Sequence, residues 1–276
     1  MSGAAPSTDQ LFDDASAIRR VGVEACLLAG AARAILLQVA HPLVGQGVAE
    51  HSRFTEDPLA RLRGTLSFVY GTVFGSVEEA DWIAGVVNGI HRHVVGAGYS
   101  ADDPELQLWV AATLYQSAEQ VYGLVFGPMP TAMAEELCRQ SSVYATSLGC
   151  PAELWPATLD EFRSYWDRQV ATLEISEAAK EICRNLYSAE SLPWYLRALL
   201  PLNSFITAAL LPDRMRNGYG FTWSPRRERL FRGGVRAAHV VYPRLPKRLR
   251  AVPTTYYLRG FRERFQKAQP PVPNLS

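Results

Sequence analysis

Apolar residues recur three and four positions apart along almost the whole chain, a spacing that places them on one face of an α-helix. The alternation of apolar and polar residues that marks a half-buried strand is nearly absent. The clearest helical segments are residues 21–40, 57–74, 76–95, 103–126 and 158–173. The pattern therefore predicts an all-α protein built as a single multi-helix domain.

Signals that start helices support these boundaries. Asp57, Asp103 and Ser224 each stand directly before a proline, which favours an N-cap followed by proline at the first helical position. Ser76 and Thr158 are each followed three residues later by a glutamate, the pattern of a capping box. We therefore expect a helix to begin at each of these positions.

Residues 41–52 interrupt the helical pattern, because Pro42 and two glycines closely follow His41. We predict a structured turn here. His41, Glu50 and His51 have side chains that could ligate a metal ion, although their spacing matches no standard site such as His-Glu-x-x-His. Capping and hydrogen bonding to the loop backbone is the alternative role for these three residues.

Four of the five histidines lie between residues 41 and 93, and His91 is the strongest functional candidate among them. Val87 and Val95 lie four residues to either side of His91, so its ring should be buried on the apolar face of its helix. His93 is rotated from it by about 200° and should face outward. A neutral imidazole in an apolar wall suits an axial ligand of haem iron or of another metal, and an ordinary core histidine is the alternative.

Arg61 and Thr65 lie one helical turn apart in the preceding predicted helix, on a face that also carries Leu62 and Leu66. The arginine could bind a haem propionate or polarise an iron-bound oxygen, and the hydroxyl could donate a hydrogen bond to that oxygen. The alternative is a surface arginine beside a threonine that bonds to its own backbone. The spacing alone leaves both interpretations open.

Charge is unevenly distributed, although the chain as a whole carries only +1. Residues 1–212 have 13 basic and 24 acidic side chains, a net charge of −11, whereas residues 213–276 have 15 and 3, a net charge of +12. The opposite signs favour docking of the basic C-terminal segment on the acidic body of the same chain over binding of nucleic acid or anionic lipid. We expect a flexible N-terminus at 1–10, a helical domain at 11–250 and a C-terminal tail at 251–276.

Missing signals exclude several classes of protein. The four cysteines are far apart without a Cys-x-x-Cys pair, so we expect neither a zinc site nor a disulfide framework. Dinucleotide-binding, Walker and nucleophile-elbow motifs are absent from the sequence.

Export and membrane signals are weak. Glu24 and Arg33 interrupt the apolar run that follows the Arg19-Arg20 pair, which argues against a twin-arginine export signal. Residues 192–211 contain Arg197 and two prolines and are a poor membrane span, although they could lie on a membrane surface.

Several sequence motifs together resemble a known family. They are Leu36-Leu37-Gln38-Val39-Ala40-His41-Pro42, Val48-Ala49-Glu50-His51-Ser52, Asp57-Pro58-Leu59 with Arg61 and Thr65, and Ile90-His91-Arg92-His93-Val94-Val95-Gly96. With them the chain resembles, over about residues 15–250, the catalytic domain shared by rubber oxygenases, or latex-clearing proteins, and the fungal MpaB-type oxygenases.

The resemblance implies an all-helical fold with a globin-like core. Rubber oxygenases hold a b-type haem and cleave carbon–carbon double bonds of polyisoprene with dioxygen. By position, His91 matches the proximal haem histidine, Arg61 the distal arginine and Thr65 the distal threonine. The lysine that precedes this threonine in rubber oxygenases is Gly64 here.

We therefore expect a haem-dependent oxygenase that uses haem b and dioxygen on a small apolar, unsaturated lipid or terpenoid. Arg61 and Thr65 would be catalytic, and His91 and Arg61 would hold the haem. His41 and His51, which belong to the shared pattern, would lie in the same pocket. We expect a cytoplasmic location and no nucleic-acid partner, with peripheral membrane contact left open. Two alternatives are a non-catalytic haem or lipid carrier on the same scaffold and a non-haem metal enzyme built on residues 41–52.

Overall fold

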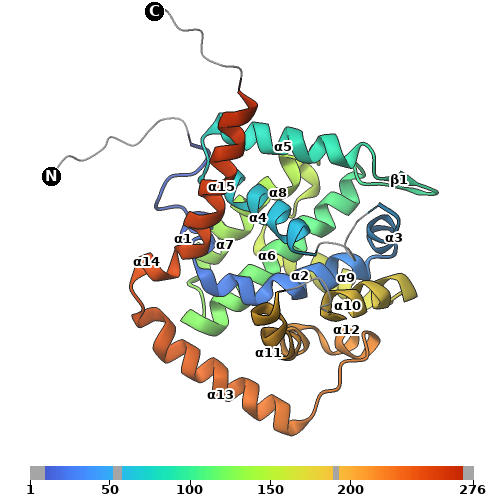
Figure 1. Ribbon diagram of the computed structural model, residues 1–276, viewed down its shortest axis with the longest axis vertical. Helices are drawn as coiled ribbons and strands as arrows, with labels where there is room; N and C mark the ends of the chain where they lie inside the picture. Colours follow the sequence, from blue (N-terminus) through green and yellow to red (C-terminus); the bar gives the residue numbers. More distant parts are fainter. Residues whose placement is uncertain (1–9, 52–57, 189–192, 270–276) are drawn as a thin grey trace, which may run out of the picture.

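Helices make up most of the chain that this computed structural model describes, namely residues 10–51, 58–188 and 193–269. The first half contains α1 (Ala17–Gly22), the 3₁₀ helix η1 (Ala25–Gly30), α2 (Ala31–Ala40), α3 (Pro42–His51), α4 (Pro58–Phe74), α5 (Val77–His91) and α6 (Pro104–Phe126). The second half contains α7 (Thr131–Ser141), α8 (Val143–Thr146), η3 (Ala152–Leu154), α9 (Leu159–Thr172), α10 (Glu177–Ser188), α11 (Trp194–Leu210), α12 (Asp213–Gly218), α13 (Pro225–Val241), η4 (Tyr242–Arg244), α14 (Lys247–Arg250) and α15 (Val252–Ala268). Between α5 and α6, the strands β1 (Val95–Gly96) and β2 (Tyr99–Ser100) form an antiparallel hairpin (Figure 1). The all-α prediction is confirmed, and the globin-like core stays a prediction.

The long helix α6 runs through the middle of the molecule, where η1, α2, α7, α8 and α13 pack on it (Figure 1). The Asp103 carboxylate caps its start by accepting a hydrogen bond from the backbone N–H of Glu105, at 2.8 Å. Gly127, with a φ of 90°, ends it. The Trp109 side chain is fully buried and donates from Nε1 to the Leu37 carbonyl at 3.1 Å, which links α6 to α2. The predicted boundaries of this helix are confirmed.

The structure corrects three sequence predictions. The turn expected over residues 41–52 is wrong, because residues 42–51 form α3, with Pro42 at its first position. A Cβ at Gly45 would lie 2.6 Å from the Val39 carbonyl oxygen, so this glycine permits the bend of 104° between residues 25–40 and α3. The expected helix over 21–40 is instead η1 followed by α2. α5 ends at His91 rather than near residue 95, because the chain turns there into the hairpin.

The predicted helix caps are present wherever the structure describes them. Ser76 forms a complete capping box with Glu79. Thr158 forms one of the two capping-box hydrogen bonds, since its hydroxyl accepts from the backbone N–H of Glu161. The second bond is shifted by one residue, because the Glu161 carboxylate accepts from the backbone N–H of Ala157 and not from that of Thr158. The predicted cap Asp57 lies outside the described residues.

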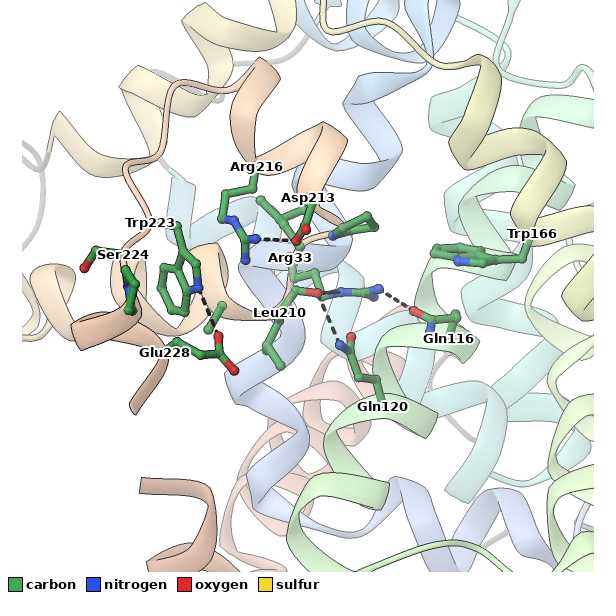
Figure 2. Close-up of a pocket in the computed structure, with 14 residues that line it drawn as sticks. Arg33, Gln116, Gln120, Trp166, Leu210, Asp213, Arg216, Trp223, Ser224 and Glu228 are labelled. Atoms are coloured by element: carbon green, nitrogen blue, oxygen red, sulfur yellow. Dashed lines mark hydrogen bonds and ion pairs between the residues drawn. The ribbon is translucent and has the colours of Figure 1, made fainter. Parts of the chain in front are cut away.

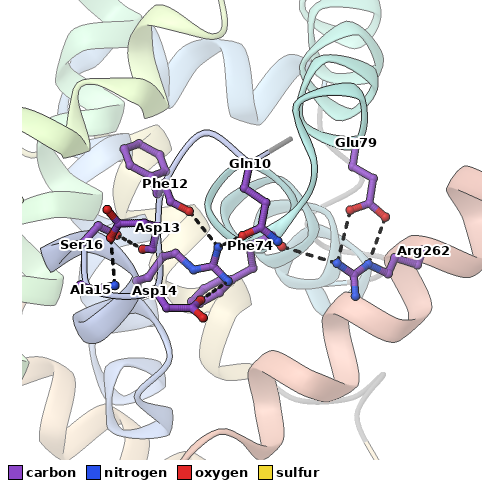
Figure 3. Close-up of polar contacts among 10 residues, drawn as sticks. Gln10, Phe12, Asp13, Asp14, Ala15, Ser16, Phe74, Glu79 and Arg262 are labelled. Atoms are coloured by element: carbon purple, nitrogen blue, oxygen red, sulfur yellow. Dashed lines mark hydrogen bonds and ion pairs between the residues drawn. The ribbon is translucent and has the colours of Figure 1, made fainter. Parts of the chain in front are cut away.

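The basic C-terminal segment docks on the rest of the chain, as the charge pattern predicts. Arg250 pairs with Glu24 at 2.8 Å, with both side chains largely buried. Arg262 pairs with Glu79 at 3.0 Å, beside the turn between α4 and α5 (Figure 3). Phe261 of α15 is fully buried in the main core cluster. Residues 252–268, expected as a tail, therefore contribute to the core.

The first described residues lie beside the same turn (Figure 3). Gln10 forms an isolated antiparallel bridge with Ser76. Arg19 donates from Nη1 to the Gln10 side chain at 2.5 Å and to the Phe12 carbonyl at 2.9 Å, and it pairs with Asp14 at 2.9 Å. Both ends of the described chain thus stabilise the region where α4 turns into α5.

The N-terminal half of α11 exposes apolar side chains. Trp194 is 80 % exposed, and Leu199 and Leu202 are each more than half exposed. Pro201 lies inside this helix and has no N–H to donate along it. No single helix among the described residues is long and apolar enough to cross a membrane. Residues 25–40 and 42–51, taken together as a bent pair of helices, are long and apolar enough by length and composition alone. Peripheral contact of α11 with a lipid surface stays a prediction, which binding to anionic vesicles would test.

All four cysteines are free thiols. Cys138, Cys150 and Cys183 are buried, and Cys26 is half-buried. Burial raises the pKa of Cys26 to about 12 and that of Cys138 and Cys183 to about 11. These residues form no disulfide in this structure.

We expect Phe261→Ala to lower the free energy of unfolding by about 3–5 kcal/mol, because it removes a fully buried ring and leaves a cavity against α4 and α5. Tyr256→Ala on the same helix is the matched control, because that ring is 70 % exposed and its loss should cost less than about 0.5 kcal/mol. Urea unfolding followed by circular dichroism measures both. Equal stability of the two variants would contradict the docking of α15.

Candidate functional site

The helices α4 and α5 form a close pair joined by only two residues, Gly75 and Ser76. The Ser76 hydroxyl accepts from the backbone N–H of Glu79 at 3.1 Å, and the Ser76 N–H donates to the Glu79 carboxylate at 2.9 Å. A Cβ at Gly75 would collide with the carbonyl oxygen of Gly71, so this position requires glycine. Because the connection is so short, the chain reverses within two residues and α5 packs back on α4.

This pairing brings Arg61, near the start of α4, within electrostatic range of His91, the last residue of α5. His91 is half-buried, and its buried Nδ1 has no hydrogen-bond partner among the described residues. Burial lowers the pKa of His91, the positive charge of Arg61 lowers it further, and the carboxylate of Asp102 opposes both. The imidazole is therefore neutral at neutral pH.

Arg61 and Thr65 lie one helical turn apart on α4, and both are half-buried. Burial lowers the pKa of Arg61, but a guanidinium remains charged at any physiological pH. Gly64, directly before Thr65, is exposed, and a Cβ built there would meet no described atom within 4 Å. The structure thus places a fixed positive charge and a hydroxyl on the helix that faces His91.

His41 is a second half-buried imidazole, located where α2 ends. Its Nδ1 is also buried without a hydrogen-bond partner in the described part of the chain. Burial lowers the pKa of His41, and the carboxylates of Asp103 and Glu105 raise it. Since Asp102 acts on His91, carboxylates of one acidic turn at the start of α6, residues 102–105, influence the pKa of both imidazoles.

His51 lies on the surface and contacts the hairpin, with its Nε2 at 3.2 Å from the Val95 carbonyl oxygen. Its neighbour Glu50 accepts a hydrogen bond of 2.5 Å from the hydroxyl of Tyr99. The Tyr99 ring packs directly on Gly47, where a Cβ would lie 3.1 Å from it. Through these two hydrogen bonds, His51 and Glu50 connect α3 to the hairpin.

The described residues contain no group of three or more His, Cys, Asp or Glu side chains that could together hold a metal ion. Protein sites for zinc or non-haem iron use three or four such ligands. The three candidate ligands of the non-haem alternative, His41, Glu50 and His51, do not form such a group among the described residues.

Sequence reasoning missed two features. The acidic turn at 102–105 shifts the pKa of both candidate histidines, and a pair of aspartates before a predicted helix was its only local signal. Arg33 is fully buried in α2, although the sequence suggested only that it interrupts an apolar run. Its position in the middle of an apolar run is the signal that could have predicted the burial of this charged residue.

Residues 18–240, which include His91, Arg61 and Thr65, match the family described as ER-bound oxygenase mpaB/B'/Rubber oxygenase, catalytic domain. The chain belongs to this oxygenase family. Membership in the mpaB/rubber oxygenase family confirms the resemblance seen in the sequence and supports an enzyme with oxygenase-type activity.

Two mycobacterial proteins are similar to this family member. They are Uncharacterized protein Rv2237 of Mycobacterium tuberculosis and Uncharacterized protein Mb2261 of Mycobacterium bovis. Each is 32% identical over 207 residues, which cover 71% of this chain and 81% of the relative. No solved structure matches the chain.

Arg61→Gln is expected to raise the pKa of His91 toward the ordinary imidazole value of 6.5, because it removes a nearby positive charge while burial persists. Arg63→Gln, which removes an exposed charge two residues along α4, is the matched control and should leave this pKa unchanged. NMR titration of the imidazole resonances in the haem-free protein measures both. An identical His91 pKa in wild type and Arg61→Gln would show that the two residues do not interact.

Proposed function

We propose that this member of the mpaB/rubber oxygenase family is a haem-dependent oxygenase, with His91 as the iron ligand and with Arg61 and Thr65 as its catalytic side chains. Its substrates would be dioxygen and a small apolar, unsaturated lipid or terpenoid. The observation that carries the proposal is the neutral, half-buried imidazole of His91, with an unpartnered nitrogen among the described residues, in electrostatic contact with Arg61.

The residues present fit a haem. A b-type haem needs one axial nitrogen from the protein, and the His91 ring has a buried nitrogen with no partner in the described chain. The lowered pKa of His91 keeps the ring unprotonated, as a ligand must be. Arg61 offers a charge that suits the carboxylates of a porphyrin, because guanidinium–carboxylate pairs are strong.

Bound haem would supply the redox-active iron that reacts with dioxygen. The contribution of the chain itself would be electrostatic. Arg61 and Thr65 would donate hydrogen bonds toward negative charge that develops on oxygen during the reaction, and their effect is larger where water is excluded. Leu66 and Phe68, which follow Thr65 on α4, are apolar and buried.

Two observations support an apolar substrate. Leu62 and Leu66, the neighbours of Arg61 and Thr65 on α4, are apolar side chains of the main core cluster. The family description also names a rubber oxygenase, and rubber is an unsaturated hydrocarbon. Gly64, which replaces the lysine expected in rubber oxygenases, distinguishes this chain from them and is the reason for keeping a non-catalytic haem or lipid carrier as the alternative.

We expect His91→Ala to abolish the Soret absorption that the wild-type protein shows with haem, because the axial nitrogen is lost. His93→Ala is the matched control. This imidazole is exposed two residues further along, and its Nδ1 bonds to the Gly89 carbonyl at 2.8 Å, so the variant should retain the haem. Absorption spectra of the ferric and ferrous forms measure the effect. Unchanged haem binding in His91→Ala would contradict the proposal.

Arg61→Gln and Thr65→Val should each reduce dioxygen consumption with an unsaturated lipid by about a hundredfold, because each removes a hydrogen-bond donor to developing charge. Turnover is expressed per bound haem, so that any loss of cofactor is corrected. Arg63→Gln on the same helix is the control and should keep full turnover. Turnover unaffected by both substitutions would remove the catalytic assignment, whereas haem binding without any dioxygen consumption would favour the carrier.

A further inference from the structure

A second polar site lies away from His91, in a pocket of about 680 Å³ (Figure 2). Its walls come from α2, α6, α9, the end of α11, α12 and the start of α13. The volume is within the range of small-molecule sites, about 300–1,000 Å³. Gln116 in the pocket is thirteen residues along the chain from Asp103 at the acidic turn, which corresponds to about 20 Å of helix. The pocket is therefore separate from the candidate haem site.

Arg33 lies at the base of this pocket with an unneutralised positive charge. The residue is 1 % exposed, and its guanidinium donates only to neutral acceptors. These are the Leu210 carbonyl at 2.8 Å, the Ser117 hydroxyl at 2.6 Å and the Gln116 side chain at 2.5 Å. No described acidic residue pairs with it. A buried charge without a counter-ion is costly, which favours an anion from outside the chain.

The charge of Arg33 persists at neutral pH. Burial lowers its pKa to about 9, which still leaves the guanidinium protonated. Three of its five N–H groups donate within the protein, and the other two have no acceptor among the described residues. Its face lies over the Trp166 ring, with the carbon atom Cζ at 5.7 Å from the ring centroid.

A second arginine lines the same pocket. Arg216 is 8 % exposed, lies over the Trp223 ring at 4.9 Å from its centroid, and bonds to Asp213 and to the Ala208 carbonyl. Its Nε is buried and has no partner among the described residues. Figure 2 shows Arg33 and Arg216 as the two basic residues of the pocket, with the two tryptophans beside them.

The acidic residues of the pocket do not neutralise Arg33, because each has its own partner. Asp213 pairs with Arg216, and its side chain is largely exposed. Glu228 accepts from Trp223 Nε1 at 3.0 Å and from Arg232 at 2.6 Å. The charge of Arg33 therefore remains in excess in the pocket.

We infer that this pocket binds a small organic oxyanion, a carboxylate or a phosphate ester, whose charge pairs with Arg33 and Arg216. The carbon skeleton of the ligand would lie against Trp166 and Trp223, which suits a molecule with an aromatic or aliphatic part. Planar guanidinium groups with free N–H donors are well suited to both carboxylate and phosphate oxygens. The inference is independent of the proposed oxygenase activity and of haem.

Titration of the full-length protein with benzoate and with inorganic phosphate, followed by tryptophan fluorescence and calorimetry, tests the inference. We expect saturable binding of at least one probe, with a dissociation constant of about 1 mM or below. Binding of benzoate alone would identify a carboxylate site, and binding of phosphate alone a phosphate-ester site. Failure of both probes to saturate would overturn the inference, whatever the outcome of the haem experiments.

Two variants test the position of the site. Arg216→Gln should weaken binding about tenfold, because it removes a charge-assisted donor. Asp213→Asn should tighten binding severalfold, because it removes the carboxylate that now pairs with Arg216, and the side chain that it changes is 86 % exposed. Arg236→Gln on the exposed part of α13 is the control and should bind like wild type. Equal affinity in all three variants would place the bound ion elsewhere and overturn the inference.

Discussion

The packing of α4 on α5 sets the geometry of the candidate site. The two helices are joined by a turn so short that their relative register cannot change without breaking it, and Gly75 is the residue that allows the chain to reverse there. A shift of one residue in either helix would rotate its side chains by about 100° and separate Arg61 from His91. Both described ends of the chain stabilise this turn, through Gln10 on one side and Arg262 on the other. The site therefore depends on contacts made well away from it.

Local chemistry explains which parts of the fold could be predicted from the sequence. α6 and the cap of α5 were placed correctly because proline, serine and glycine act within one turn of the backbone. α3 was mistaken for a turn because its glycines are tolerated only through neighbours that the sequence does not reveal. Gly45 packs on α2 and Gly47 on Tyr99, and both contacts require the folded molecule. Tertiary packing outweighed helix propensity at these positions.

The candidate site was predictable in part. The identity of His91, Arg61 and Thr65 came from motifs, whereas the closeness of His91 to Arg61 is a property of the helix pair. The anion pocket was not predictable, because its walls come from six segments spread between residues 33 and 228. Of these, only Arg33 gave a local signal, a charge within an apolar run. Charge patterning predicted correctly that the basic segment would dock, but not that the described residues of α13 would all stay unburied.

The free cysteines have a bearing on how such a protein would withstand its own chemistry. Oxidants attack the thiolate form of sulfur, and the fraction of thiolate falls tenfold for each unit by which the pKa exceeds the ambient pH. With pKa values near 11 or 12, Cys26, Cys138 and Cys183 hold their protons almost completely. In a member of an oxygenase family, thiols held in this protonated form would be modified only slowly by oxidants.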